Sequence, residues 1–182
     1  MIDNIRRKTI SSKWYTDEHI LKIEKENIFS KSWHLFCSTD QISKPGDYKT
    51  MMINGQPIII IKDENSSINA FYNVCQHRGC VLLDNDGNAK NLKCGYHGWV
   101  YDLNGNLKAV RGFDKQKIKI EDFSLKPVEH HVWMNLIFVK LQNECYSIKK
   151  TLAKIEKIIS PIRFNQYSYH SRVSYKINCN WK

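Results

Sequence analysis

Four residues that commonly bind metals fall into two short segments of this sequence. Each segment pairs one cysteine with one histidine: Cys75 with His77, and Cys94 with His97, with 16 residues between His77 and Cys94. Glycines accompany both pairs, and a glycine lets backbone amides approach a metal-bound sulfur closely. Two such segments at the tips of facing hairpins would enclose a metal centre.

Two thiolates and two imidazoles suit a [2Fe-2S] cluster. Two imidazoles in place of two thiolates on one iron remove negative charge and raise the reduction potential to roughly −150 to +300 mV, from about −400 mV for all-cysteine clusters of the plant type. In this interpretation Cys75 and Cys94 bind one iron, and the two histidines bind the other. Zinc is the main alternative for such a ligand set, although zinc fingers usually pair Cys with Cys and His with His. A catalytic Cys–His nucleophile would leave the second pair unexplained.

The residues around these segments predict small antiparallel sheets. Turn signals recur at Pro45-Gly46, Asn54-Gly55, Asp86-Gly87 and Asn104-Gly105. Between and after the turns, β-branched or alternating segments predict strands over 58–61, 68–74 and 132–141.

Helices are expected on both sides of this all-β module. Thr16 with the two acidic residues after it predicts a helix over 17–32, with Thr16 as its cap. Apolar residues spaced three and four apart predict a second helix over 147–159, ahead of Pro161. The aromatic and partly alternating segment 163–182 predicts a final strand.

Composition narrows the class of protein. With 182 residues the chain can bury its own core, so the six cysteines need not form disulfides. Cys37, Cys145 and Cys179 are predicted to be small buried hydrophobic residues.

The charge of +10 comes mainly from scattered lysines, which indicates a solvated surface and no nucleic-acid partner. A local patch of Lys115, Lys117 and Lys119 suits an acidic electron donor. Neither a membrane span nor a secretory signal is present, which predicts a cytoplasmic protein.

Together the two metal-binding segments closely resemble the α-subunits of Rieske non-haem iron oxygenases of the ring-hydroxylating type. The resemblance rests on Cys75-x-His77-Arg78-Gly79, on Cys94-x-Tyr96-His97-Gly98-Trp99-x-Tyr101-Asp102-Leu103-x-Gly105, on Pro45-Gly46-Asp47-Tyr48, and on Asn180-Trp181-Lys182. It implies that Cys75, His77, Cys94 and His97 bind a Rieske [2Fe-2S] cluster. Many members have Pro where this chain has Gly95. In respiratory Rieske proteins a disulfide joins the two loops; Tyr96 replaces one partner here and leaves Cys80 without a mate, which favours the oxygenase branch.

The resemblance also implies an architecture. We expect a mainly β Rieske-type iron–sulfur domain over 41–142, preceded by a helical segment over 1–40. Residues 143–182 are expected to supply a helix and the first strand of a truncated α+β catalytic domain. Around the cluster, Arg78 is a candidate hydrogen-bond donor, whereas Tyr96, Trp99 and Tyr101 would shield the cluster from water.

In this family a reductase or ferredoxin supplies electrons, and a mononuclear iron in a neighbouring subunit of a homotrimer or α3β3 assembly activates O₂. That Fe(II) is expected only in the missing downstream domain, because no two-histidine, one-carboxylate set stands out among His19, His34, His130, His131 and His170. The chain alone should therefore be inactive as an oxygenase. Aromatic rings and quaternary amines both remain open as substrates. The alternative function is a free-standing Rieske ferredoxin, which would not need the helix over 17–32 or the 167–182 tail.

Overall fold

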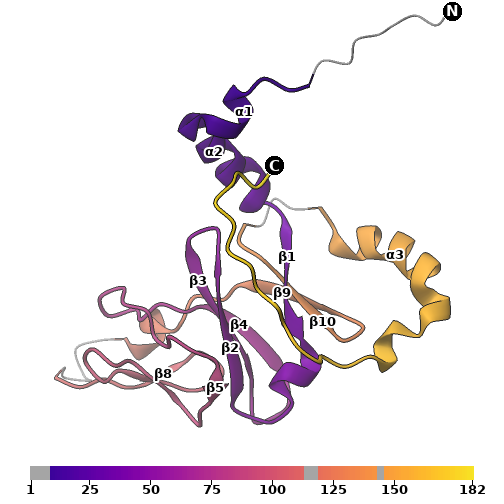
Figure 1. Ribbon diagram of the computed structural model, residues 1–182. Coiled ribbons are helices and arrows are strands. Elements are labelled where there is room, and N and C mark those ends of the chain that lie inside the picture. The colour runs from indigo at the N-terminus through magenta and orange to yellow at the C-terminus, as the bar shows by residue number, and fades with distance from the viewer. Residues whose placement is uncertain (1–8, 113–118, 143–145) are drawn as a thin grey trace, which may run out of the picture.

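Small antiparallel sheets dominate the computed structural model, which describes residues 9–112, 119–142 and 146–182 (Figure 1). The three sheets have the strand orders β1-β10-β9, β4-β3-β2-β5 and β6-β7-β8. Their strands are β1 (Trp33–Ser38), β2 (Asp47–Ile53), β3 (Gln56–Lys62), β4 (Ile68–Tyr72), β5 (Gly87–Asn88), β6 (Leu92–Lys93), β7 (Val100–Tyr101), β8 (Leu107–Ala109), β9 (Glu129–Trp133) and β10 (Leu136–Lys140). The predicted mainly β class is confirmed.

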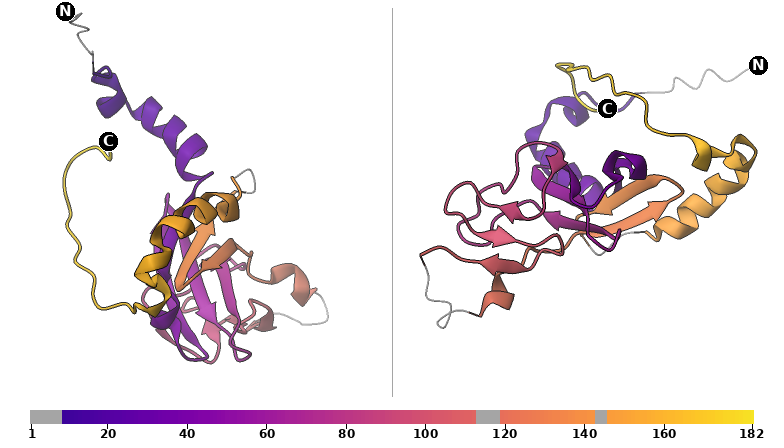
Figure 2. Two further views of the ribbon diagram at one scale, coloured as in Figure 1. Left: turned by 90° about the vertical axis from the view of Figure 1, so that its right-hand side faces the viewer. Right: turned by 90° about the horizontal axis from the view of Figure 1, so that it is seen from below.

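Helices are short and lie outside the sheets. They are α1 (Lys13–Thr16), α2 (Glu18–Glu24), the π-helical turn η1 (Lys25–Phe29), α3 (Ile148–Ile159), and the 3₁₀ turns η2 (Thr39–Ile42), η4 (Ile120–Phe123), η5 (Ser160–Ile162) and η6 (Phe164–Gln166). The β6-β7-β8 sheet and α3 lie at opposite sides of the molecule, with the four-stranded sheet between them (Figures 1 and 2). No helix in the described ranges has the length and apolar character needed to cross a membrane.

Strand β3 is buried on both faces. The four isoleucines at 58–61 have no exposed surface, as their continuous β-branched run predicts. Alternation along the strand divides them between two cores. Ile59 and Ile61 pack with Cys75 and Cys94, whereas the other two pack against residues of β1 and β10. The strand therefore connects the metal-binding loops to the rest of the fold.

One predicted strand is two strands in the structure. Residues 132–141 do not form a single long strand, because the chain reverses after Trp133 and β9 pairs with β10 in antiparallel register. The reversal places Met134 in the left-handed region, at φ +54°. The turn carries no glycine or proline, so the prediction from sequence was wrong at this position.

The N-terminal helix differs from its prediction in its cap and its second half. Its N-cap is Asp17, whose Oδ1 accepts a hydrogen bond from the His19 N–H at 2.8 Å, whereas Thr16 ends α1. The second half winds as the π-helical η1. The helix predicted over 147–159 is confirmed as α3, with Ser147 at its N-cap.

The strand predicted over 163–182 is not formed. The 3₁₀ turn η6 occupies its start, and residues 167–182 run without a ladder to any described strand. An alternating sequence becomes a strand only when a neighbouring strand takes its backbone hydrogen bonds. Here the Tyr169 N–H instead donates to the Asp40 carboxylate at 2.6 Å.

The cysteines outside the metal-binding pairs have different environments. Cys37 is buried, as predicted, and burial raises the pKa of its thiol to about 12. The same prediction is wrong for Cys179, which is exposed. Cys145 lies outside the described residues. So do Lys115 and Lys117 of the predicted basic patch, whereas Lys119 is described and exposed.

A buried ion pair joins the two ends of the described chain. The Glu24 side chain is buried, and its oxygens accept hydrogen bonds from Lys182 Nζ at 2.7 and 2.9 Å and from Trp181 Nε1 at 2.9 Å. The Trp181 ring packs edge-on against Phe29, with centroids 5.0 Å apart. The C-terminal segment thus lies beside α2 and η1 (Figure 1).

We expect Glu24→Gln to weaken this contact at neutral pH, because it removes the charge that pairs with Lys182. Hydrogen bonds from Lys182 and then Trp181 lower the pKa of Glu24. The stabilisation is therefore complete above the ordinary glutamate pKa of about 4.3 and is lost as the pH falls through the lowered value in the folded protein. Amide hydrogen exchange over 18–29 should be faster in the variant at neutral pH, and this difference should vanish in acid.

The matched control is Glu26→Gln, because Glu26 is exposed on the same helical segment. It should leave the exchange rates unchanged at both pH values. If Glu24→Gln behaves like this control, the ion pair does not hold the helix.

Candidate metal centre

Residues 75–80 form a tight loop between β4 and β5. The Cys75 N–H donates to the Cys80 carbonyl at 2.8 Å, and the Gly79 N–H donates to the Cys75 carbonyl at 3.0 Å. The buried Asn73 holds the chain beyond this loop, because its Nδ2 donates to the Leu83 carbonyl at 2.6 Å and its Oδ1 accepts from the Leu83 N–H at 3.1 Å. The loop is therefore closed by its own backbone and by one buried amide.

Residues 94–99 repeat this hydrogen-bond pattern between β6 and β7. The Cys94 N–H donates to the Trp99 carbonyl at 2.8 Å, and the Gly98 N–H donates to the Cys94 carbonyl at 3.0 Å. Gly98 and its counterpart Gly79 have φ values of +72° and +73°. This backbone region strains residues that carry a side chain, so both loops depend on glycine at this position.

The structure brings all four predicted ligands together as two pairs. The imidazole rings of His77 and His97 have centroids 4.7 Å apart. Cys75 and Cys94 are each 1% exposed and belong to one apolar cluster, and each affects the pKa of the other. The sulfurs thus lie in the core, whereas the half-buried imidazoles lie nearer the surface.

Cys75 has a hydrogen bond that the sequence analysis did not predict. The Tyr101 hydroxyl oxygen lies 3.4 Å from its Sγ and accepts a hydrogen bond from the Gln76 N–H at 3.0 Å. Since that oxygen already accepts from the amide, its own hydrogen can donate to the sulfur. Burial raises the pKa of Cys75, and the Tyr101 hydroxyl and the His77 amide oppose this shift.

Cys94 lies in a different electrostatic environment. Burial alone would raise its pKa, but hydrogen bonds from the Tyr96 amide, the Cys80 thiol and the His97 amide outweigh burial and lower it. The Cys80 sulfur lies 3.3 Å from the Cys94 sulfur. These donors favour the thiolate, which is the form that binds iron.

His97 supplies a direct test of whether a metal fits here. Its Nδ1 is buried and has no hydrogen-bond partner within the described part of the chain. A buried polar atom without a partner costs free energy, roughly 1 to 3 kcal/mol, and a metal ion at that nitrogen would remove the cost. The residues therefore fit a metal centre at the imidazole end of the site.

His77 is held by stacking. Its ring lies parallel to the buried Trp99 ring, with centroids 4.7 Å apart and an interplanar angle of 9°. Burial, with the positive charges of His97 and Arg78, lowers the pKa of His77. The lowered pKa favours the neutral imidazole, which is the form that binds metals.

The other residues predicted near the site divide into buried and exposed. Trp99 and Tyr101 are 2% and 0% exposed, so they shield the sulfurs as predicted. Tyr96 is 63% exposed and lies against the His97 ring, at 3.8 Å between centroids. Arg78 is exposed. Across all described residues, no three His, Cys, Asp or Glu side chains are placed to hold a single metal ion.

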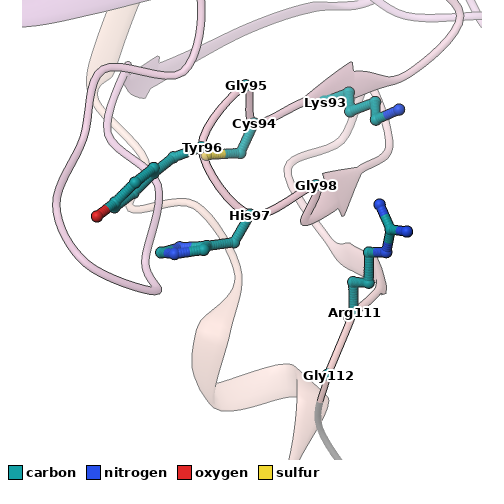
Figure 3. A pocket seen from close by; sticks show the side chains of 8 residues that line it. All are labelled: Lys93, Cys94, Gly95, Tyr96, His97, Gly98, Arg111 and Gly112. Atoms are coloured by element: carbon teal, nitrogen blue, oxygen red, sulfur yellow. The ribbon is translucent and has the colours of Figure 1, made fainter.

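An open cavity adjoins the second loop. It is lined by Cys94, Tyr96 and His97 together with the basic side chains Lys93 and Arg111. Figure 3 shows Tyr96 and His97 pointing to one side of the loop, with Lys93 and Arg111 on the other. Solvent and small molecules can therefore approach this loop.

Comparison with known proteins agrees with this geometry. The carnitine monooxygenase oxygenase subunit of Escherichia coli (strain K12) is 31% identical over 185 residues, covering 96% of this chain and 48% of that subunit. The benzene 1,2-dioxygenase subunit alpha of Pseudomonas putida is 43% identical over 102 residues, covering 56% of this chain and 23% of that subunit. A crystal structure of a quaternary ammonium Rieske monooxygenase in complex with L-carnitine matches with a TM-score of 0.77 and 31% identity, covering 84% of this chain and 44% of that one.

This chain thus spans less than half the length of each of these relatives. The sequence model of the Rieske [2Fe-2S] domain family matches residues 32–124 of this chain. This range includes both metal-binding loops. Domains of this kind hold a [2Fe-2S] cluster with two cysteine and two histidine ligands. The chain therefore belongs to the Rieske [2Fe-2S] domain family.

Proposed function

We propose that this chain is the electron-transfer part of a Rieske oxygenase α-subunit. Cys75 and Cys94 bind one iron of the cluster, and His77 and His97 bind the other. The buried, unpartnered Nδ1 of His97 carries this proposal, because it requires a partner, and the ring of the second histidine lies close by, with centroids 4.7 Å apart. When bound, the cluster accepts and returns one electron at a time.

The cysteine side and the histidine side of the site have different surroundings. The apolar cluster of Ile59, Leu92 and Tyr101 covers the two cysteines on their buried side. On the other side, the half-buried imidazoles lie close to the surface and offer a short path for an electron. Electrons are therefore expected to pass through the histidine side of the site.

The relatives indicate the setting of this electron transfer. The proteins that match are oxygenase subunits, which favours this function over a free-standing carrier. We propose that a reductase or ferredoxin supplies the electrons, and that a mononuclear iron outside these 182 residues receives them within a multimer, a trimer in the family. Both carnitine and benzene occur in the relatives' names, so the substrate class stays open.

We also propose three parts of the chain: a helical segment over 1–40, the Rieske domain over 41–142, and a connecting segment over 143–182. Strand β1 lies in the first part and pairs with β10 in the second, so these parts share a sheet.

Replacing His77 or His97 by Ala tests the ligand set. The wild-type chain, reconstituted without oxygen, should hold about two irons and take up one electron. Each variant should lose the Rieske electron paramagnetic resonance signal, because one iron position then lacks its nitrogen ligand. The exposed His170→Ala is the matched control and should keep the signal. A wild-type signal from the double variant His77→Ala/His97→Ala would exclude this ligand set.

Tyr101→Phe tests the hydrogen bond to Cys75. The phenol hydrogen stabilises negative charge on the sulfur, so its removal should make the cluster harder to reduce. One net hydrogen bond contributes about 1 kcal/mol, which corresponds to a fall in midpoint potential on the order of 40 mV for one electron. Redox titration should show this fall with an otherwise intact visible spectrum. Tyr72→Phe, which removes a hydroxyl bound to the Leu141 carbonyl instead, should leave the potential unchanged.

A further inference from the structure

Cys80 contacts a proposed ligand without being one of the four ligands itself. Its sulfur lies 3.3 Å from the sulfur of Cys94, although the two residues come from different loops. Both are free thiols, Cys94 buried and Cys80 partly exposed. Two sulfurs in contact are candidates for oxidation to a disulfide.

Little movement separates the two sulfurs from a bond. Their distance must fall from 3.3 Å to about 2.05 Å. Gly79 precedes Cys80 and Gly95 follows Cys94, and a side-chain carbon added at Gly95 would meet nothing within 4 Å. The space beside both glycines is therefore open.

A small oxidant can approach this pair beside the second loop, although Cys94 itself is 1% exposed. The cavity beside the second loop has a volume of about 580 Å³, and Cys94 is part of its lining (Figure 3). Hydrogen peroxide is far smaller than this cavity. Cys80 adds a second route because it is partly exposed.

We propose that Cys80 and Cys94 form a reversible disulfide when the cluster-free protein meets hydrogen peroxide. The Cys94 sulfur attacks one peroxide oxygen, the O–O bond breaks, and a sulfenic acid and one water result. The Cys80 sulfur then attacks the Cys94 sulfur, the S–S bond forms, and the S–O bond breaks with release of a second water. Two thiols are oxidised, and one peroxide is reduced to two waters.

The disulfide protects Cys94 from irreversible damage. Without Cys80, further peroxide would take the sulfenic acid to sulfinic acid, which dithiols do not reduce. With Cys80, a dithiol restores both thiols, and the cluster can then be assembled. This consequence rests on the proposed ligand role of Cys94, whereas formation of the disulfide does not.

Tryptic peptides separate the three cysteines of the two loops. Trypsin cuts after Lys62, Arg78, Lys90, Lys93 and Lys108, so that Cys75, Cys80 and Cys94 lie in peptides 63–78, 79–90 and 94–108. The cluster-free chain of 182 residues is treated with equimolar hydrogen peroxide, alkylated, digested without reductant and examined by mass spectrometry. We expect a linked pair of 79–90 with 94–108. A portion measured before alkylation should have an intact mass lower by two hydrogens.

Three variants complete the test. Cys80→Ser and Cys80→Ala should give no linked pair. With excess peroxide, which supplies the second equivalent that sulfinic acid requires, their Cys94 should accumulate as sulfinic acid. Cys179→Ser, which lacks only an exposed thiol, should behave as the wild type. After treatment with dithiothreitol, the wild type should regain most of its ability to assemble the cluster, judged by visible absorbance, and the Cys80 variants should not.

Two results would overturn the proposal. One is a linked pair of 63–78 with 94–108 as the main product, and the other is equal sulfinic acid at Cys94 with and without Cys80. If the 79–90 and 94–108 pair forms but blocked Cys94 still permits cluster assembly, the disulfide stands and the ligand role of Cys94 fails.

Discussion

Two loops with the same backbone hydrogen bonds must face each other for this site to exist, and much of the described structure serves that requirement. Each loop closes on its first cysteine and turns at a glycine with a φ near +70°. A short loop of this kind cannot bury its own side chains. Both cysteines are instead packed into one apolar cluster with Ile59 and Ile61 of β3. The spacing of the sulfurs thus depends on a strand distant in sequence from the second loop.

The position of β3 between two cores explains how the loops are supported. Its alternate isoleucines pack on the sheet β1-β10-β9 on one face and on the cysteine-bearing cluster on the other. Displacement of either core would therefore move the strand and the loops together. Close packing transmits such shifts, since protein interiors have few voids that could absorb them.

Within the site, the two sulfurs are stabilised by different donors. The Cys75 sulfur contacts the Tyr101 hydroxyl. The Cys94 sulfur accepts hydrogen bonds from backbone amides and contacts the Cys80 thiol. Hydrogen bonds to a thiolate favour negative charge on it and so favour the reduced cluster. Both cysteines are buried and both imidazoles are half-buried, and this difference is the basis of the proposed electron path through the histidine side.

The sequence by itself determined those elements whose pattern of residue types lies within one short segment. The two Cys/His pairs were recognisable from residue type and spacing. The β-branched run at 58–61 predicted a buried strand, and the apolar spacing over 147–159 predicted α3; both are observed. In each case the prediction used residues close together in the sequence, so it did not depend on contacts with distant segments.

Contacts between distant segments decided the rest. The chain reverses at Met134 without a glycine, because β9 and β10 satisfy each other's hydrogen bonds. Residues 167–182 alternate like a strand, yet they run beside no described strand that takes their backbone groups. The contact of Tyr101 with Cys75 joins residues 26 positions apart, and that of Cys80 with Cys94 crosses two loops. Spacing along a chain does not report such contacts, because packing of the whole domain sets which side chains meet.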